Sequence, residues 1–146
     1  MKTTNILSFI EKRTHELENH VALGIRSNLG WNEITFKGLS TLAKRLASYL
    51  IDIGIDKGDK VAILSESTPE LGATLFANVL AGAISVPLDV KLTIHELTHI
   101  LSDCTPKAIM TSSAHLADAI KLKEIIPSLE HIVILDGRGA NSDYIN

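Results

Sequence analysis

The chain has one cysteine, few aromatic residues (4%) and no long hydrophobic run. One cysteine excludes an intrachain disulfide, and we interpret Cys104 as a buried structural thiol because no neighbouring group would activate it. No segment approaches the ~20 apolar residues of a transmembrane helix. Residues 1–18 carry three glutamates and lack the apolar core of a signal peptide. We therefore expect a cytoplasmic protein without a membrane span.

Concentrated positive charge is also missing. The fourteen lysines and arginines are scattered in runs no longer than two, and the net charge is −3. This distribution removes the electrostatic basis for binding nucleic acid or an anionic membrane. The 146 residues, 45% apolar and 21% charged, have instead the balance of one globular domain.

Hydrophobic periodicity predicts an N-terminal helix over about 5–18, followed by a hairpin of strands 20–26 and 31–35. From residue 36 onward helices and strands alternate. The expected helices are 37–53, 69–81, 94–102 and 113–125, and the expected strands are 61–64, 84–88, 107–111 and 131–136. Such alternation predicts an α/β fold with a layered, mostly parallel sheet and helices on both faces. We assign 1–136 to this α/β unit and 137–146 to a flexible polar tail.

The helix over 69–81 is apolar almost all round. Thr68 and Pro69 mark its start, and Gly82 marks its end. Its large apolar residues do not form a single stripe, so we expect deep burial on all sides. These residues are Leu71, Leu75, Phe76, Val79 and Leu80.

One local motif has the spacing of a zinc site, namely His95-Glu96-Leu97-Thr98-His99. Histidines four apart on a helix share a face and can hold zinc, while the intervening glutamate acts as general base. Against this, Thr93 and Glu96 have the spacing of a capping box, which would occupy the carboxylate. The third ligand would have to be His115 or Glu124, neither of which is marked by a motif. We therefore favour surface histidines and no metal site, and keep a zinc peptidase as the remote alternative.

A more extended pattern runs over residues 31–111. Trp31 to Leu39 is similar to a "T-Y-x-E-L" segment, and 54–63 is similar to "G-x-x-x-G-D-x-V-A-I". Residues 81–89 are similar to "A-G-A-x-x-V-P-L-[DN]". Because these pieces stand in register, the chain resembles the N-terminal region of the adenylate-forming (AMP-binding) superfamily. It is most like an acyl-CoA synthetase, or fatty-acid–CoA ligase.

The resemblance implies a parent enzyme that uses ATP, Mg²⁺ and CoA to convert a carboxylic acid, which we take to be a fatty acid, into a thioester. Relatives grip the ATP phosphates with a Ser/Thr/Gly-rich loop downstream of this region and carry a catalytic lysine on a C-terminal domain. Neither is in the chain, and Thr111-Ser112-Ser113-Ala114 lacks the glycine and lysine of such a loop. We therefore assign no catalytic residue, expect no cofactor on this chain alone, and expect the fragment to be inactive. The resemblance places Pro87 and Leu88 along the path of the thiol acceptor.

Two alternatives stay open beside the acyl-CoA synthetase. The chain could be a fragment of a peptide-synthetase adenylation domain, or a non-catalytic α/β module. In each case its partner would be the missing remainder of the protein. A homodimer is also expected, because an uncovered sheet edge or apolar patch favours association.

Overall fold

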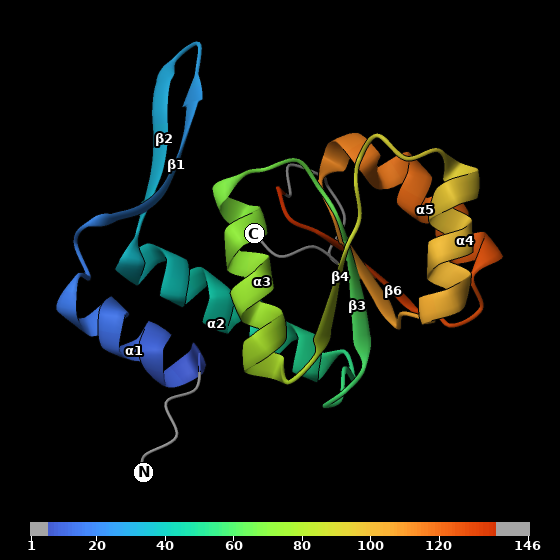
Figure 1. Ribbon diagram of the computed structural model, residues 1–146, viewed down its shortest axis with the longest axis horizontal. Coiled ribbons are helices and arrows are strands. Elements are labelled where there is room, and N and C mark those ends of the chain that lie inside the picture. The colour runs from blue at the N-terminus through green and yellow to red at the C-terminus, as the bar shows by residue number, and fades with distance from the viewer. Residues whose placement is uncertain (1–5, 137–146) are drawn as a thin grey trace.

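The computed structural model of the chain describes residues 6–136 (Figure 1). Its elements are, in chain order, α1 (Ile6–Glu16), β1 (Val21–Ser27), β2 (Gly30–Thr35), α2 (Phe36–Asp52), β3 (Lys60–Leu64), α3 (Pro69–Ala81), β4 (Ile84–Pro87), α4 (Ile94–Cys104), β5 (Ala108–Thr111), η1 (Ser113–His115), α5 (Leu116–Ile125) and β6 (His131–Ile134). They confirm the expected helices and strands to within a few residues. The helix expected over 113–125 begins as the 3₁₀ turn η1. The expected tail, 137–146, lies outside the described residues.

Two sheets are present in the described part of the chain. Strands β1 and β2 form an antiparallel hairpin that projects from the body, and β4-β3-β5-β6 form a parallel sheet in that spatial order (Figure 1). In the register of the central strands, Ala62 lies opposite both Val86 and Ile109. The layered parallel sheet expected from the alternating pattern is thereby confirmed.

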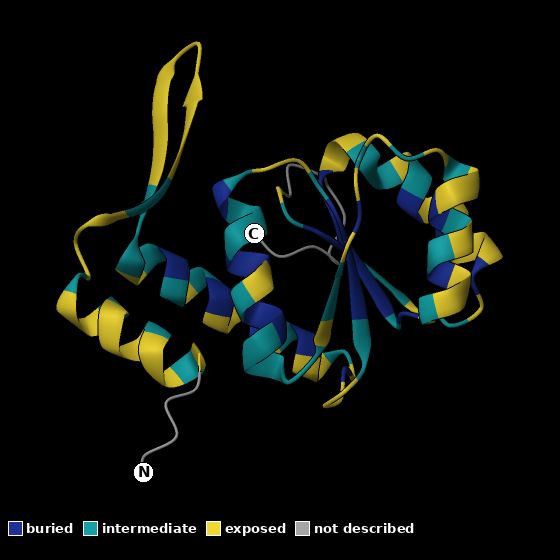
Figure 2. Ribbon diagram, in the orientation of Figure 1, coloured by how far each residue is buried: buried dark blue, intermediate teal, exposed yellow. Residues whose placement is uncertain are grey.

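Helices cover both faces of the parallel sheet. On one face, Val61 and Met110 pack in a core with residues of α2 and α3. On the other face, Ala62, Leu64 and Ile109 pack against α4 and α5. Strand β3 is therefore covered on both sides, and none of its residues from Val61 to Leu64 is more than 1% exposed (Figure 2). This two-sided cover explains why β3 reads as a continuous apolar run.

The ends of α3 are set as expected. The Thr68 hydroxyl accepts a hydrogen bond from the Leu71 amide, and Pro69 occupies the first helical position. Gly82 ends the helix with a φ of 76°, a left-handed conformation that glycine adopts without steric cost.

The burial of α3 differs from the prediction. The fully buried positions are the small or polar ones, Ala73, Thr74, Ala77 and Asn78, whereas Leu75 is 40% exposed. Leu71, Phe76, Val79 and Leu80 are half-buried. Small side chains let the helix lie close to its neighbours, so Phe76 and Leu80 pack at the margin of the core and Leu75 faces outward. The prediction of deep burial on all sides was therefore wrong.

Helix α1 is amphipathic but loosely seated. Leu7, Ile10 and Leu17 are half-buried as the stripe predicts, yet no residue of α1 is fully buried. Every helix in the described part is too short or too polar to cross a bilayer.

We predict that replacing Leu50 by alanine will destabilise the chain far more than the same change at its neighbour Ile51. Leu50 is fully buried between α2 and the sheet, while Ile51 is 55% exposed. Removing a buried leucine side chain costs about 2–5 kcal/mol because a cavity remains. Urea unfolding followed by circular dichroism measures both variants. Equal losses of unfolding free energy would contradict this packing.

Candidate functional site at the carboxyl edge of the sheet

The order of the strands creates a switch point between β3 and β5. Strand β3 continues through α3 to β4 on one side, whereas β5 continues through α5 to β6 on the other. The chain therefore leaves the carboxyl ends of β3 and β5 in opposite directions. In open parallel sheets this divergence is where ligands bind.

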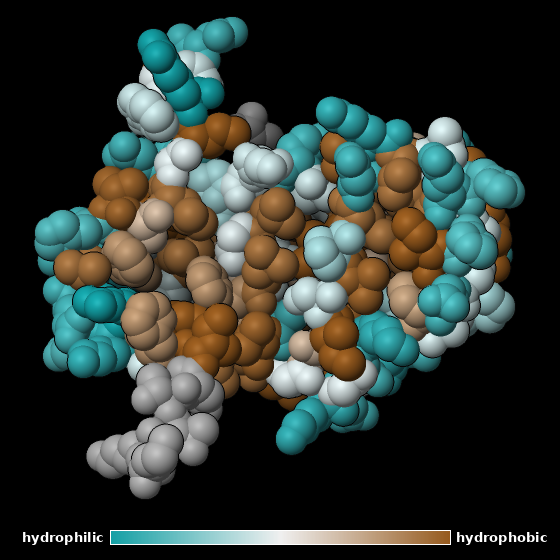
Figure 3. Space-filling view, in the orientation of Figure 1, coloured by the Kyte–Doolittle hydropathy of each residue, from teal (hydrophilic) through white to brown (hydrophobic). Residues whose placement is uncertain are grey.

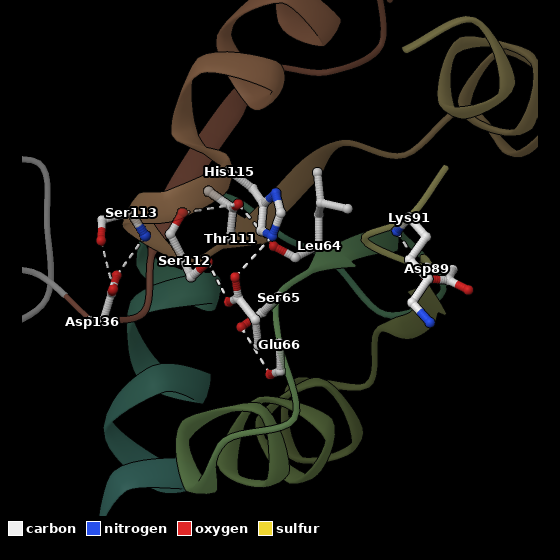
Figure 4. Close-up of polar contacts among 10 residues, drawn as sticks. All are labelled: Leu64, Ser65, Glu66, Asp89, Lys91, Thr111, Ser112, Ser113, His115 and Asp136. Carbon is white, nitrogen blue, oxygen red and sulfur yellow. Dashed lines mark hydrogen bonds and ion pairs between the residues drawn. The ribbon is translucent and has the colours of Figure 1, made fainter. Parts of the chain in front are cut away.

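A carboxylate occupies this point. Glu66, two residues beyond β3, accepts a hydrogen bond at Oε2 from the Ser112 hydroxyl at 2.7 Å (Figure 4). Its Oε1 lies 2.9 Å from Nε2 of His115, a distance at which a protonated imidazole forms an ion pair. The ring nitrogen has no aligned hydrogen-bond partner among the described residues, so we treat this contact as electrostatic. Glu66 thus joins the loop after β3 to the turn after β5.

Two further polar contacts hold the same edge. The Thr111 hydroxyl donates to the Leu64 carbonyl at 2.8 Å and is buried. The Asp136 carboxylate accepts from the Ser113 amide at 2.7 Å and from the Ser113 hydroxyl at 2.6 Å. Asp136 follows β6, so it caps η1 from the end of a different strand. The carboxyl ends of β3, β5 and β6 are therefore linked by side chains.

The Ser112 hydrogen bond holds the pKa of the Glu66 carboxyl below its ordinary value, with a further contribution from the charge of His115. Partial burial raises the pKa, by less than the Ser112 hydrogen bond lowers it. Glu66 is therefore ionised at neutral pH, with Oε2 accepting from Ser112 and Oε1 placed beside His115.

The expected acceptor-path residues lie at the same edge of the sheet. Pro87 ends β4 and is exposed, and Leu88 follows it and is buried. The Leu88 amide donates to the Ile63 carbonyl at 2.8 Å, which fixes this segment beside β3. Their role along a thiol path remains a prediction.

The zinc hypothesis finds no support in the described part of the chain. Glu96 is held in the capping box, where its carboxylate accepts from the Thr93 amide at 2.8 Å, and this bond lowers the pKa of Glu96. His95 and His99 are exposed, and His115 contacts Glu66 instead. Across residues 6–136, three metal-ligating side chains do not converge anywhere. Glu124 is an exposed residue of α5.

Cys104 is half-buried rather than fully buried. Burial raises the pKa of its thiol above the ordinary value, which disfavours the nucleophilic thiolate.

Carboxylates are prominent at the described carboxyl edge. Glu66, Asp89 and Asp136 follow three of its four strands, and carboxylates repel a polyphosphate. The hydroxyls of Ser112 and Ser113 already donate to carboxylates. Phosphate binding needs free amides and cations, so no catalytic step is assigned to these residues.

Sequence reasoning missed the cluster of Glu66, Ser112 and His115. It treated His115 as an isolated histidine and the serines only as a failed phosphate loop. A usable signal was present, because Glu66 and Ser112 each follow a buried strand at its carboxyl end. Polar residues at such positions meet at one edge once the strands are parallel.

The chain matches the family model described as "AMP-binding enzyme" over residues 10–144. It is 32% identical over 111 residues to the long-chain-fatty-acid–CoA ligase FadD13 of Mycobacterium tuberculosis. The aligned residues cover 75% of this chain and 21% of that protein. It is 27% identical over 115 residues to the nonribosomal peptide synthetase easA of Emericella nidulans, covering 78% of this chain and 2% of that one.

Solved structures agree with these matches. The anthranilate CoA ligase AuaEII, in complex with anthranoyl-AMP, superimposes with a TM-score of 0.80 and 27% identity over 90% of this chain and 25% of that one. The chain thus spans about a fifth of FadD13 and about a quarter of AuaEII.

We predict that acid will weaken the fold in part through Glu66. Its pKa is lowered in the folded state, so its stabilising contribution is present above the unfolded value of about 4.3 and is lost as pH falls through the folded pKa. Urea unfolding at several pH values below 5 should show a shallower loss of stability for Glu66→Gln than for the unchanged chain. If the free energy of unfolding falls equally with pH in both proteins, the contacts of Glu66 do not stabilise the fold. Glu124→Gln, an exposed glutamate of α5, is the matched control.

Proposed function

Because this chain belongs to the AMP-binding enzyme family, we propose that the protein of which it forms part activates a carboxylic acid with ATP. The substrate carboxylate attacks the α-phosphorus of ATP, the bond to the β-phosphate oxygen breaks, and acyl-AMP and pyrophosphate result. A thiol of CoA or of a carrier protein then attacks the acyl carbon and displaces AMP, leaving a thioester. Mg²⁺ would accompany the ATP. The observation that carries this proposal is the family match over residues 10–144.

Within that reaction we assign the chain a scaffold role. It supplies a parallel sheet covered on both faces and a carboxyl edge held by side-chain contacts. Neither a G-x-x-x-x-G-K-[ST] loop nor a T-S-G-T-T-G-x-P-K-G loop occurs in its 146 residues, and its described edge is acidic. We therefore expect the chain by itself to be inactive.

A fatty acid is the substrate we favour, since FadD13 is named as a long-chain-fatty-acid ligase. Adenylation of an amino acid is the second candidate, supported by the similarity to easA. AuaEII is named as an anthranilate ligase, so aromatic acids belong in any substrate survey. A cytoplasmic location is inferred from the single cysteine.

We expect pyrophosphate release from the whole protein and none from residues 1–146. The assay mixes each protein with ATP, Mg²⁺ and a panel of fatty, aromatic and amino acids, and couples pyrophosphate to a colour reaction. Inactivity of the whole protein towards every acid would overturn the proposed activity. Turnover by the 146-residue chain would overturn the scaffold role.

Association of the chain with itself is a further part of the proposal. An apolar groove of about 320 Å³ runs between α1, α2 and α3, lined in part by Ile10, Leu39 and Phe76. Apolar side chains gather over this part of the surface (Figure 3). We favour this groove over the β4 edge for self-association. The Ile84 and Leu88 amides donate to the Asp59 and Ile63 carbonyls, and Pro87 has no N–H group with which to pair another strand.

Sedimentation velocity over a range of concentrations tests this association. We expect the chain to form dimers as concentration rises and Phe9→Ser to shift the equilibrium towards monomer. Phe9 lines the groove and is 50% exposed, so its loss removes apolar contact area. Lys12→Ser, one helical turn away and exposed, is the control. A monomer at every concentration would rule out the homodimer.

A further inference from the structure

The loops that follow β3 and β5 have little backbone connection to each other. The ladder between the two strands ends with Leu64 opposite Thr111. Beyond it, one long backbone bond joins the Ser112 amide to the Leu64 carbonyl at 3.4 Å. From there the two loops diverge towards opposite faces of the sheet. Their relative position therefore depends on side chains.

Glu66 supplies the short contact across this gap. Its two carboxylate oxygens lie 2.7 Å from the Ser112 hydroxyl and 2.9 Å from Nε2 of His115. Ser112 is 6% exposed, so its hydroxyl has little water to replace this bond. Ser112 precedes η1 and His115 ends it, so the two contacts restrict the turn 112–115 in position and in rotation.

The neighbouring serine carries this restriction to β6. Ser113 donates from both its amide and its hydroxyl to Asp136, the second residue beyond β6. The residues Glu66, Ser112-Ser113 and Asp136 thus form one polar connection from β3 through β5 to the end of β6 (Figure 4). This connection therefore fixes the positions of Ser113 and Asp136 relative to β3.

We propose that Glu66 is a positioning residue that fixes the turn 112–115 and, through Ser113, the position of Asp136 after β6. This inference rests on the proposed function for its consequence, which is that the carboxyl edge of the sheet keeps the geometry that the whole enzyme needs for acyl-AMP formation. Glu66 does so without contacting the reacting atoms. Its carboxylate is suited to this role because two acceptor oxygens can serve two partners from different positions of one turn.

Hydrogen exchange on the 146-residue chain tests the connection directly. In Glu66→Gln, one of the two acceptor oxygens is replaced by an amide group. We expect the Ser113 amide to exchange about tenfold faster, while the Met110 amide in the sheet is unchanged. Glu124→Gln should alter neither amide. An unchanged rate at Ser113 in Glu66→Gln would overturn the inference.

A double-mutant cycle separates positioning from local stability. Glu66→Gln and Asp136→Asn are compared singly and together by the exchange rate of the Ser113 amide and by urea unfolding. Coupling between the two changes is expected, because they act on adjacent serines of one connection. Fully additive effects on both measurements would show two independent contacts and would also overturn the inference.

The consequence for activity is measured on the whole protein by ATP–pyrophosphate exchange. Glu66→Gln should lower kcat about tenfold with little change in the KM for ATP. Displacement of the turn 112–115 is expected to affect the reacting geometry more than the binding of ATP. Activity equal to that of Glu124→Gln would refute the positioning role. If the unchanged whole protein is inactive, the proposed function fails, while the exchange experiments still decide whether Glu66 fixes the turn.

Discussion

Burial of β3 from both sides is the constraint on which the rest of the structure depends. Residues Val61 to Leu64 are enclosed by α2 and α3 on one face and by α4 and α5 on the other. A parallel strand with two apolar faces needs both helix layers at once. The chain meets this need by sending β4 to one side of β3 and β5 to the other. The switch point at the carboxyl edge follows directly from that arrangement.

The same arrangement concentrates polar groups at one edge. Backbone groups beyond the strand ends no longer find partners in the ladder, so hydroxyls and carboxylates replace them. Thr111 bonds the Leu64 carbonyl, Glu66 bonds Ser112, and Asp136 caps Ser113. These contacts occupy several of the carboxylate and hydroxyl groups at the edge. This arrangement is the basis for the scaffold role proposed above.

The outer surfaces of helices α1 and α3 carry exposed apolar side chains. Helix α3 places small residues inward and leaves Leu75 exposed, and α1 leaves a groove against α2 and α3. Exposed apolar side chains grouped in this way favour association with another surface. The chain covers only about a fifth of FadD13. The groove shares residues with the core, because Leu39, Phe76 and Leu80 line it and also pack in the cluster between α2, α3 and the sheet.

Local chemistry in the sequence was enough to determine the elements, their caps and the family. The Thr93–Glu96 capping box, the proline and glycine at the ends of α3 and the alternation of helix and strand all depend on residues close in the chain. Motifs in register then indicated an adenylate-forming relative, and the family match confirms it.

The tertiary structure alone decided which strands are neighbours. Helical and strand periods fix what each segment is but carry no information about where β5 lies relative to β3 and β4. Glu66 and Ser112 are 46 positions apart, and Ser113 and Asp136 are 23 apart. They meet only because the sheet has the order β4-β3-β5-β6. The tertiary structure also decided which face of α3 is packed. The helix lies close to its neighbours, so alanines fit on that face and a leucine does not, although the helix is apolar almost all round.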